Sequence, residues 1–260
     1  NIFETVNKNT SRNFSENSER IAALAPFYIQ TIDAVIQFLQ NRQPTLAHQI
    51  CSRNYLPEAS RFNLLEEMEW AFGSMGIQDK ARHLCTLYLE DLSDFIIENI
   101  DENFGFSRYA ERLGRSAHTF DELYENLSQE NSYIDQVTIE LLSQSIELYS
   151  PKMVGFSVPF PGNLYSAFKC AQWLKKNHPE IKITMGGGFP NTELRSVSDP
   201  RVFEFFDFIT LDDGEAPILL LTQWLEGKID DEELKRTLSL NKEQQVIYHN
   251  SSNYKRTYPY

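Results

Sequence analysis

The sequence predicts an α/β protein, in which a partial, Rossmann-like parallel sheet of flavodoxin-like strand order follows an all-α region. Before residue 150, apolar residues recur with helical spacing. After Pro151 they form short continuous runs instead, at residues 153–158, 181–185 and 206–211. A strand, a helix and a second strand within about 30 residues are typical of a βαβ unit. We therefore expect a helical region over residues 1–150 and an α/β portion over residues 151–250.

The helical region begins after a polar lead-in, residues 1–18. Each expected helix rests on apolar residues spaced three and four apart, which give a helix one buried face. Prolines and glycines separate these segments, because neither residue favours a helix interior. The expected helices are residues 21–39, interrupted at Pro26; 64–72; 79–100, capped by Asp79; a helix starting near Thr119; and 134–149.

The α/β portion alternates its elements along the chain. The first strand ends in the turn of residues 160–163 and leads into a helix with Leu164, Phe168 and Leu174 on one face. The second strand ends in three glycines, and the third ends in an acidic turn. The remaining expected elements are a helix over residues 217–224, a β-hairpin of residues 236–240 and 245–248, and a linker over residues 251–260.

Composition excludes several classes of partner and cofactor. The net charge of −13 argues against nucleic-acid binding, which needs clustered Lys and Arg. The cysteines Cys51, Cys85 and Cys170 form no CxxC pair, and the five histidines stand apart, so we expect no metal site. No apolar run approaches the roughly 18 residues of a membrane span, and the given sequence shows no signal-peptide pattern. We expect a cytoplasmic protein with no membrane partner and no catalytic residue in this chain.

Three unusual segments fall at the carboxyl ends of the expected strands, where ligands bind in open parallel sheets. Glycines 186–188 leave the backbone bare, which allows a ring system or nucleotide to approach, although a tight turn also explains them. Ser157 lies inside an apolar strand. A hydrogen bond from its hydroxyl to a ligand and one to the neighbouring backbone explain this position equally well. The acidic residues 212–215 fit acid–base chemistry or a solvated loop.

This part of the chain resembles the cobalamin-binding domain of B12-dependent radical S-adenosylmethionine enzymes. The resemblance rests on VGFSVPFPGN at 154–163, MGGGFPNTEL at 185–194 and DFITLDDGEAP at 207–217. Upstream, LYLEDLSD at 87–94 and FGFSRY at 104–109 are similar to a helical insertion in one branch of that family. The similarity covers residues 77–226.

The resemblance implies that cobalamin lies across the three strand ends. It implies that Ser157 and the glycines lie along the nucleotide tail of the cofactor, with the acidic turn beside the same cleft. It also implies a parent enzyme with a [4Fe–4S] cluster and S-adenosylmethionine, bound by a barrel after Tyr260. The expected cofactor-binding residues are Ser157, Pro159, Gly162, Asn163, Gly186, Gly187, Gly188, Phe189, Thr210, Asp213, Gly214 and Glu215.

Departures from the family pattern limit what this chain can do alone. It has no DxHxxG motif to supply a histidine to cobalt, and no CxxxCxxC motif to bind the cluster. The family's first strand, helix and second strand would precede Asn1, so we interpret the sequence as a piece of a longer protein. We expect the cobalamin-binding portion of a radical enzyme that transfers a methyl group or carries out a related reaction. The alternative is a degenerate α/β module that binds no corrin and docks a peptide or protein partner.

Overall fold

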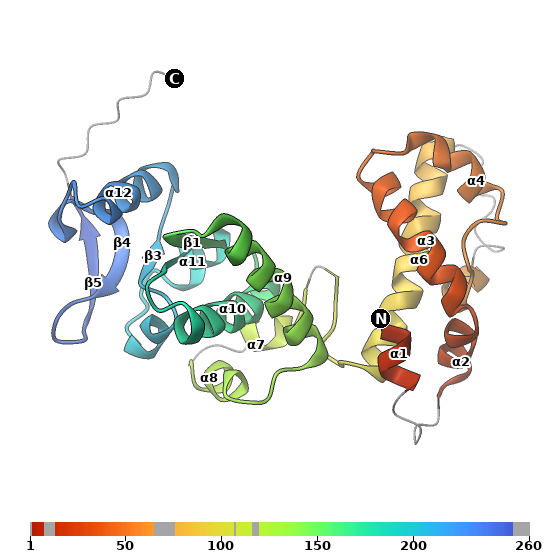
Figure 1. Cartoon of the computed structure of the whole chain (residues 1–260), viewed down its shortest axis with the longest axis horizontal. Helices are drawn as coiled ribbons and strands as arrows, with labels where there is room; N and C mark the ends of the chain where they lie inside the picture. The colour runs from red at the N-terminus through yellow and green to blue at the C-terminus, as the bar shows by residue number, and fades with distance from the viewer. Residues whose placement is uncertain (1, 8–13, 65–75, 107, 116–119, 252–260) are drawn as a thin grey trace. The chain divides into compact units, whose positions relative to one another are not determined.

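The computed structural model describes the chain except residues 1, 8–13, 65–75, 107, 116–119 and 252–260 (Figure 1). The chain divides into two compact units, residues 1–105 and residues 106–260. The fold is mixed α/β, with a helical region before the sheet, as the sequence predicts. The change from helix to strand falls near residue 150, but the division between compact units falls earlier, after Gly105.

The first unit is helical and is built around one long helix, α6. The expected helix over residues 79–100 is confirmed, but α6 begins two residues earlier, after Gly76. Asp79 therefore lies in the first turn, where a carboxylate favours the helix dipole, and is not the cap. The helices are α1 Ile2–Asn7, α2 Glu16–Ala23, α3 Ala25–Leu39, α4 Ala47–Cys51 and α6 Ile77–Asn99, with 3-10 turns η1 Pro44–Leu46 and η2 Ser60–Leu64. Most of the expected helix 64–72 lies outside the described residues.

Aromatic residues of α3 and α6 form the core of this unit. The Tyr28 and Tyr88 rings lie 4.9 Å apart, and the Tyr88 hydroxyl donates a hydrogen bond to the Tyr28 carbonyl oxygen at 3.1 Å. Asp91 of α6 is fully buried and accepts hydrogen bonds from the backbone N–H groups of Ala59 and Arg61. This carboxylate therefore accepts hydrogen bonds from backbone N–H groups that have no partner within the first turn of η2.

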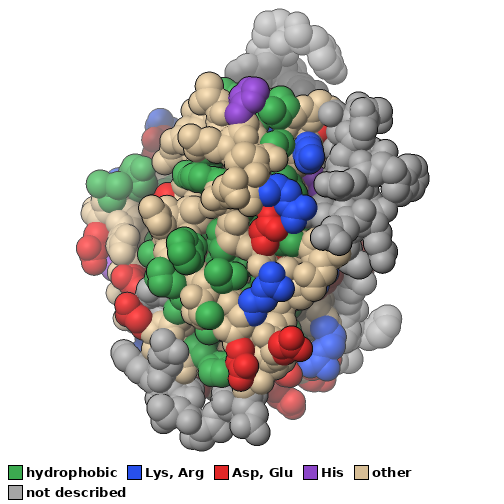
Figure 2. Space-filling view, turned by 90° about the vertical axis from the view of Figure 1, so that its right-hand side faces the viewer, with side chains coloured by type: hydrophobic (Ala, Val, Ile, Leu, Met, Phe, Trp, Pro, Cys, Tyr) green, Lys and Arg blue, Asp and Glu red, His purple; other side chains and the backbone are tan. Residues whose placement is uncertain are grey.

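Helix α3 also leaves apolar side chains at the surface, with Phe27 56% exposed and Ile29 51% exposed. The surface drawn in Figure 2 likewise mixes hydrophobic side chains with acidic and basic ones. No single helix among the described residues is long and apolar enough to cross a membrane. Helices α2 and α3 meet the length and composition criterion only as a pair, and they are bent by 74° at their junction.

The second unit contains one sheet of five strands in the order β1-β2-β3-β4-β5. The first three strands are parallel and the last two form an antiparallel hairpin beside β3, as the sequence predicts. The three parallel strands are joined by helical connections, which parallel pairing requires. Their bounds are β1 Met153–Ser157, β2 Lys182–Gly186, β3 Phe208–Thr210, β4 Lys235–Leu240 and β5 Val246–Asn250.

The helices that precede the sheet in sequence belong to the same compact unit as the sheet. Lys169 of α10 donates hydrogen bonds to the carbonyl oxygens of Leu127 and Gln129, which fastens the connection before α9. At its start α9 has a capping box between Ser132 and Asp135. These helices are α7 Glu111–Arg115, α8 Asp121–Leu127 and α9 Tyr133–Tyr149, followed by α10 Leu164–Asn177, α11 Gly188–Glu193 and α12 Glu215–Leu225.

The two faces of the sheet differ in composition. Val154, Phe156, Ile183, Met185 and Ile209 share one face and pack in the core that contains α10. On the other face, Phe208 packs against Leu220 and Leu221 of α12. The strand register places Gly155, Ser157, Thr184, Gly186 and Thr210 on this α12 face, because side chains alternate between faces along a strand.

Candidate functional site

Five small residues line the α12 face of the parallel strands toward their carboxyl ends. We call Gly155, Ser157, Thr184, Gly186 and Thr210 the strand-end cradle. Gly155 pairs with Thr184 and Ser157 pairs with Gly186 across the β1–β2 ladder. The position that a Cβ on Gly186 would occupy lies 2.5 Å from Thr210 Oγ1, so the second and third strands are also in close contact here.

The cradle combines exposed backbone with a buried hydroxyl. Gly155 and Ser157 are exposed, although both lie within a strand. Thr184 is 1% exposed, and its Oγ1 has no hydrogen-bond partner among the described residues. The Thr210 hydroxyl instead donates to the Met185 carbonyl oxygen at 3.3 Å. An unpaired buried hydroxyl is unfavourable, so a hydrogen-bond partner for Thr184 Oγ1 would stabilise the protein, although surrounding atoms cover this hydroxyl in the structure.

The acidic turn after β3 lies at the same edge of the sheet. Asp212 has a φ of 59° and is paired with Arg195. Asp213 is paired with Arg236 at 3.4 Å. No heavy atom lies within 4 Å of where a Cβ on Gly214 would be, and Glu215 is exposed in the first turn of α12. Of the predicted residues in this turn, Gly214 and Glu215 therefore face open space, while the Asp213 carboxylate is in an ion pair.

Gly187 and Gly188 are contacted by the backbone of the loop that follows β1. The sequence predicts instead that these glycines leave bare backbone for a ligand. Gly187 has a φ of 110°, and a Cβ there would lie 2.8 Å from the Val158 carbonyl oxygen. A Cβ on Gly188 would lie 2.8 Å from the Pro159 carbonyl oxygen. Phe189 N–H donates to the Val158 carbonyl oxygen at 3.0 Å. On this side the glycines permit two loops of the chain to pack together, which corrects the expectation of bare backbone.

Two further predicted residues lie at the start of α10. Gly162 is buried, and a Cβ there would lie 2.6 Å from Arg108 Cα, so this glycine permits close packing of the segment before α7. Asn163 occupies the cap position of α10, but its side chain makes no capping hydrogen bond. The sequence allowed for such a cap, and the structure does not form it. These two residues belong to the packing of the α10 start.

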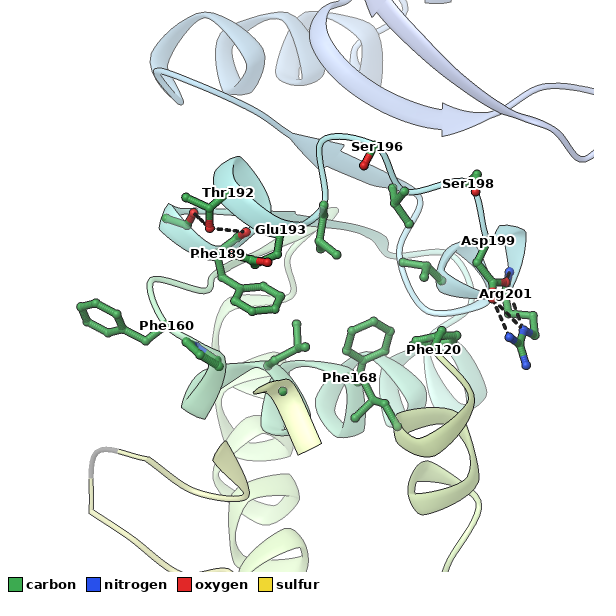
Figure 3. Close-up of a pocket in the computed structure, with 18 of the residues that line it drawn as sticks. Phe120, Phe160, Phe168, Phe189, Thr192, Glu193, Ser196, Ser198, Asp199 and Arg201 are labelled. Carbon is green, nitrogen blue, oxygen red and sulfur yellow. Dashed lines mark hydrogen bonds and ion pairs between the residues drawn. The ribbon is translucent and has the colours of Figure 1, made fainter. Parts of the chain in front are cut away.

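A cavity of about 900 Å³ lies on the α10 side of the second unit. Pro159, Gly188 and Phe189, all predicted site residues, line it together with Leu164 and Phe168 of α10. Figure 3 shows Phe160, Phe168 and Phe120 along one wall and Phe189, Thr192 and Glu193 on the opposite wall. The predicted residues are thus divided between this cavity, the cradle, the glycine loop after β2, the start of α10 and the acidic turn after β3.

Sequence reasoning missed Gly155 and Thr184 as site residues. Gly155 carried a usable signal, because a glycine inside a strand often marks close approach of another group. Thr184 was a polar residue between the apolar residues Ile183 and Met185. Within the described residues, no group of three or more His, Cys, Asp or Glu side chains is arranged to hold a metal ion.

No protein-family profile, no curated protein and no solved structure matches this chain.

Proposed function

We propose that this chain is the cobalamin-binding portion of a B12-dependent radical S-adenosylmethionine enzyme, and that the strand-end cradle receives the nucleotide tail of the cofactor. The [4Fe–4S] cluster and S-adenosylmethionine would bind elsewhere in the parent protein. When bound, cobalamin would supply a metal centre able to carry a methyl group. The residues of this chain would hold and orient the cofactor.

The observation that supports this proposal most strongly is the exposed backbone of Gly155 on the face that also carries Thr184, whose hydroxyl has no partner among the described residues. A nucleotide tail carries phosphate and ribose oxygens, which accept hydrogen bonds from serine and threonine hydroxyls. The small side chains of the cradle leave room for a flat base against the sheet. The residues present therefore fit the chemistry of the tail.

The first test replaces Gly155 with valine. A Cβ at this position would contact only Thr184 Cγ2, at 3.5 Å, so the fold has room for it. Valine also favours strands, on a scale that spans about 1 kcal/mol. We expect Gly155→Val to fold with unchanged or higher stability and to lose cobalamin binding, measured by visible absorbance of protein desalted after incubation with hydroxocobalamin.

The second test replaces Thr184 with valine, which removes the hydroxyl and keeps the shape of the side chain. Because the hydroxyl has no partner among the described residues, stability should not fall. Cobalamin affinity should fall several-fold in a titration. If the unchanged chain binds no hydroxocobalamin, or both variants bind it as well as the unchanged chain, the proposal is wrong. The former result would favour a module that docks a peptide or protein, which can use the open edge of β1.

A further inference from the structure

The cavity on the α10 side lies apart from the strand-end cradle. The cradle lies on the α12 face of the sheet, whereas the cavity is lined by Leu164 and Phe168, which belong to the core on the α10 face. At about 900 Å³ it falls within the range of roughly 300–1,000 Å³ that is typical of small-molecule sites. A second ligand therefore has a site of its own.

The walls of this cavity are apolar and aromatic. Phe168 is 2% exposed and Phe189 is 6% exposed, so both rings are fixed by the surrounding core. In Figure 3 these two rings point into the space between the walls. Phe160, which is 66% exposed, lies at one end of the space. Buried aromatic walls favour a ligand with an apolar body, because binding removes its surface from water.

The charged side chains of the described residues that line the cavity are predominantly acidic. They are three carboxylates, on Asp121, Glu193 and Asp199, and one guanidinium, on Arg201. Arg201 Nη2 donates to Asp121 at 2.7 Å, and Arg201 Nε donates to Asp199 at 3.0 Å. The guanidinium also lies 5.6 Å from the Phe120 ring centroid. Arg201 is therefore already neutralised and is a poor partner for an anionic ligand.

Glu193 is the acidic group that remains available. It is the last residue of α11, it is exposed, and among the described residues it has no ion-pair partner. Thr192, its neighbour, uses its hydroxyl on the backbone carbonyl oxygens of Gly188 and Phe189. Because Glu193 is exposed, water screens its charge, so its attraction for a cation adds modestly to the burial of an apolar body.

We propose that this cavity binds an apolar cation, with the apolar body between Phe168 and Phe189 and the positive group beside Glu193. The same chemistry is found in a free hydrophobic amine and in a peptide segment with apolar residues next to Arg or Lys. This site is independent of the cobalamin proposal, because the two sites lie on opposite faces of the sheet.

The test compares probes that share one body and differ in charge. Phenylalanyl-β-naphthylamide is cationic, its N-acetyl form is neutral and its N-succinyl form is anionic. We expect the cation to bind to the full chain about tenfold more tightly than the anion, which corresponds to roughly 1.4 kcal/mol. The difference should shrink at high salt. A peptide arm compares acetyl-Phe-Leu-Arg-amide with acetyl-Phe-Leu-Glu-amide for the same charge preference. The affinity of the Arg peptide relative to that of phenylalanyl-β-naphthylamide shows which source of the cation the cavity prefers.

Two variants assign the binding to this cavity. Glu193→Gln should remove the preference for the cation and leave binding of the neutral probe unchanged, while Glu243→Gln, an exposed change in the hairpin turn, should alter neither. Val197→Trp, on the cavity wall, should block all probes. Thermal unfolding of each variant checks that the fold is intact. The proposal is overturned if no cation binds, if the anion binds as tightly as the cation, or if Glu193→Gln and Glu243→Gln behave alike.

Discussion

At the scale of single residues, Gly187 allows the loops after β1 and β2 to approach one another. Its φ of 110° is rarely adopted by other residues, and a Cβ would lie within 2.9 Å of three backbone atoms of Val158. We expect Gly187→Ala to lower the free energy of unfolding by about 2–4 kcal/mol, from backbone strain and a contact that cannot relax by side-chain rotation. Urea denaturation measures this change.

Gly227→Ala is the matched control for Gly187→Ala. Gly227 also has a positive φ, 70°, but no heavy atom lies within 4 Å of its Cβ position. This substitution therefore isolates the backbone strain, which we expect to be about 1 kcal/mol. Equal losses of stability for the two variants would show that the contact with Val158 contributes nothing.

His249 gives the hairpin a predicted pH dependence. Its imidazole Nε2 is hydrogen-bonded to Ser239 Oγ at 2.8 Å, and burial lowers the pKa of this histidine below its usual 6.5, against a smaller opposing effect of Asp231. Because the folded pKa is depressed, the unfolded chain binds more protons below about pH 6.5, and stability falls as the pH falls through this window. The His249→Gln variant should lose this contribution to the pH dependence of its stability. Unfolding free energies of both proteins at pH 7 and pH 5 test this, and parallel curves would contradict it.

At the scale of elements, Lys169 fixes the connection between α8 and α9. It is 2% exposed and donates to Leu127 O, Gln129 O and the Asn131 side chain, while burial lowers its pKa despite the nearby Asp135. We expect Lys169→Met to lower stability by about 1–3 kcal/mol, because three hydrogen bonds to the ammonium group are lost, while the Leu127 carbonyl oxygen keeps a hydrogen bond from Gln172. Hydrogen exchange should increase at residues 127–132.

Lys176→Met on the same helix is the control, since Lys176 is exposed. It should change stability by less than about 0.5 kcal/mol. If Lys169→Met is as mild as this control, and exchange at residues 127–132 is unchanged, the three hydrogen bonds do not hold the connection.

The sheet was predictable from sequence because its signals are local. Apolar runs, turn residues and the spacing of the hairpin define all five strands to within two residues at each end. The role of Gly187 was not predictable, because it depends on contact with Val158, which is distant in sequence. The division of the chain at Gly105 likewise depends on contacts such as that of Lys169 with Leu127. A pattern within one segment does not encode such contacts.

The candidate site was predicted only in part, because some of its features follow from local sequence signals and others depend on contacts between distant segments. The rule that ligands bind at strand ends directed attention to Ser157, Gly186 and Thr210, which the structure brings together. It did not separate the two faces of the sheet, so Pro159 and Phe189 were grouped with them although they line the cavity. Which face a loop residue serves depends on the loop conformation, and the sequence does not specify that.

At the scale of the whole molecule, each compact unit carries its own hydrophobic core. Phe95 is 1% exposed and packs against Phe3, with their ring centroids 5.2 Å apart, in the core of residues 1–105. Phe206 is fully buried and packs against Phe168, at 4.9 Å, in the core of residues 106–260. Separate cores of this kind unfold cooperatively within themselves, and a chain with two cores need not be two-state.

We therefore expect calorimetry of the full chain to show two transitions, each assignable with one substitution. Phe95→Ala and Phe206→Ala each remove a buried ring from one core, at a loss of about 3–5 kcal/mol in that unit. Phe95→Ala should lower the Tm of one transition and leave the other in place, and Phe206→Ala should do the reverse. A single transition that both variants shift equally would mean that the two cores unfold as one cooperative system. In that case, substitutions in residues 1–105 would also weaken binding at the cradle through stability alone, so binding should be measured well below the Tm of each variant.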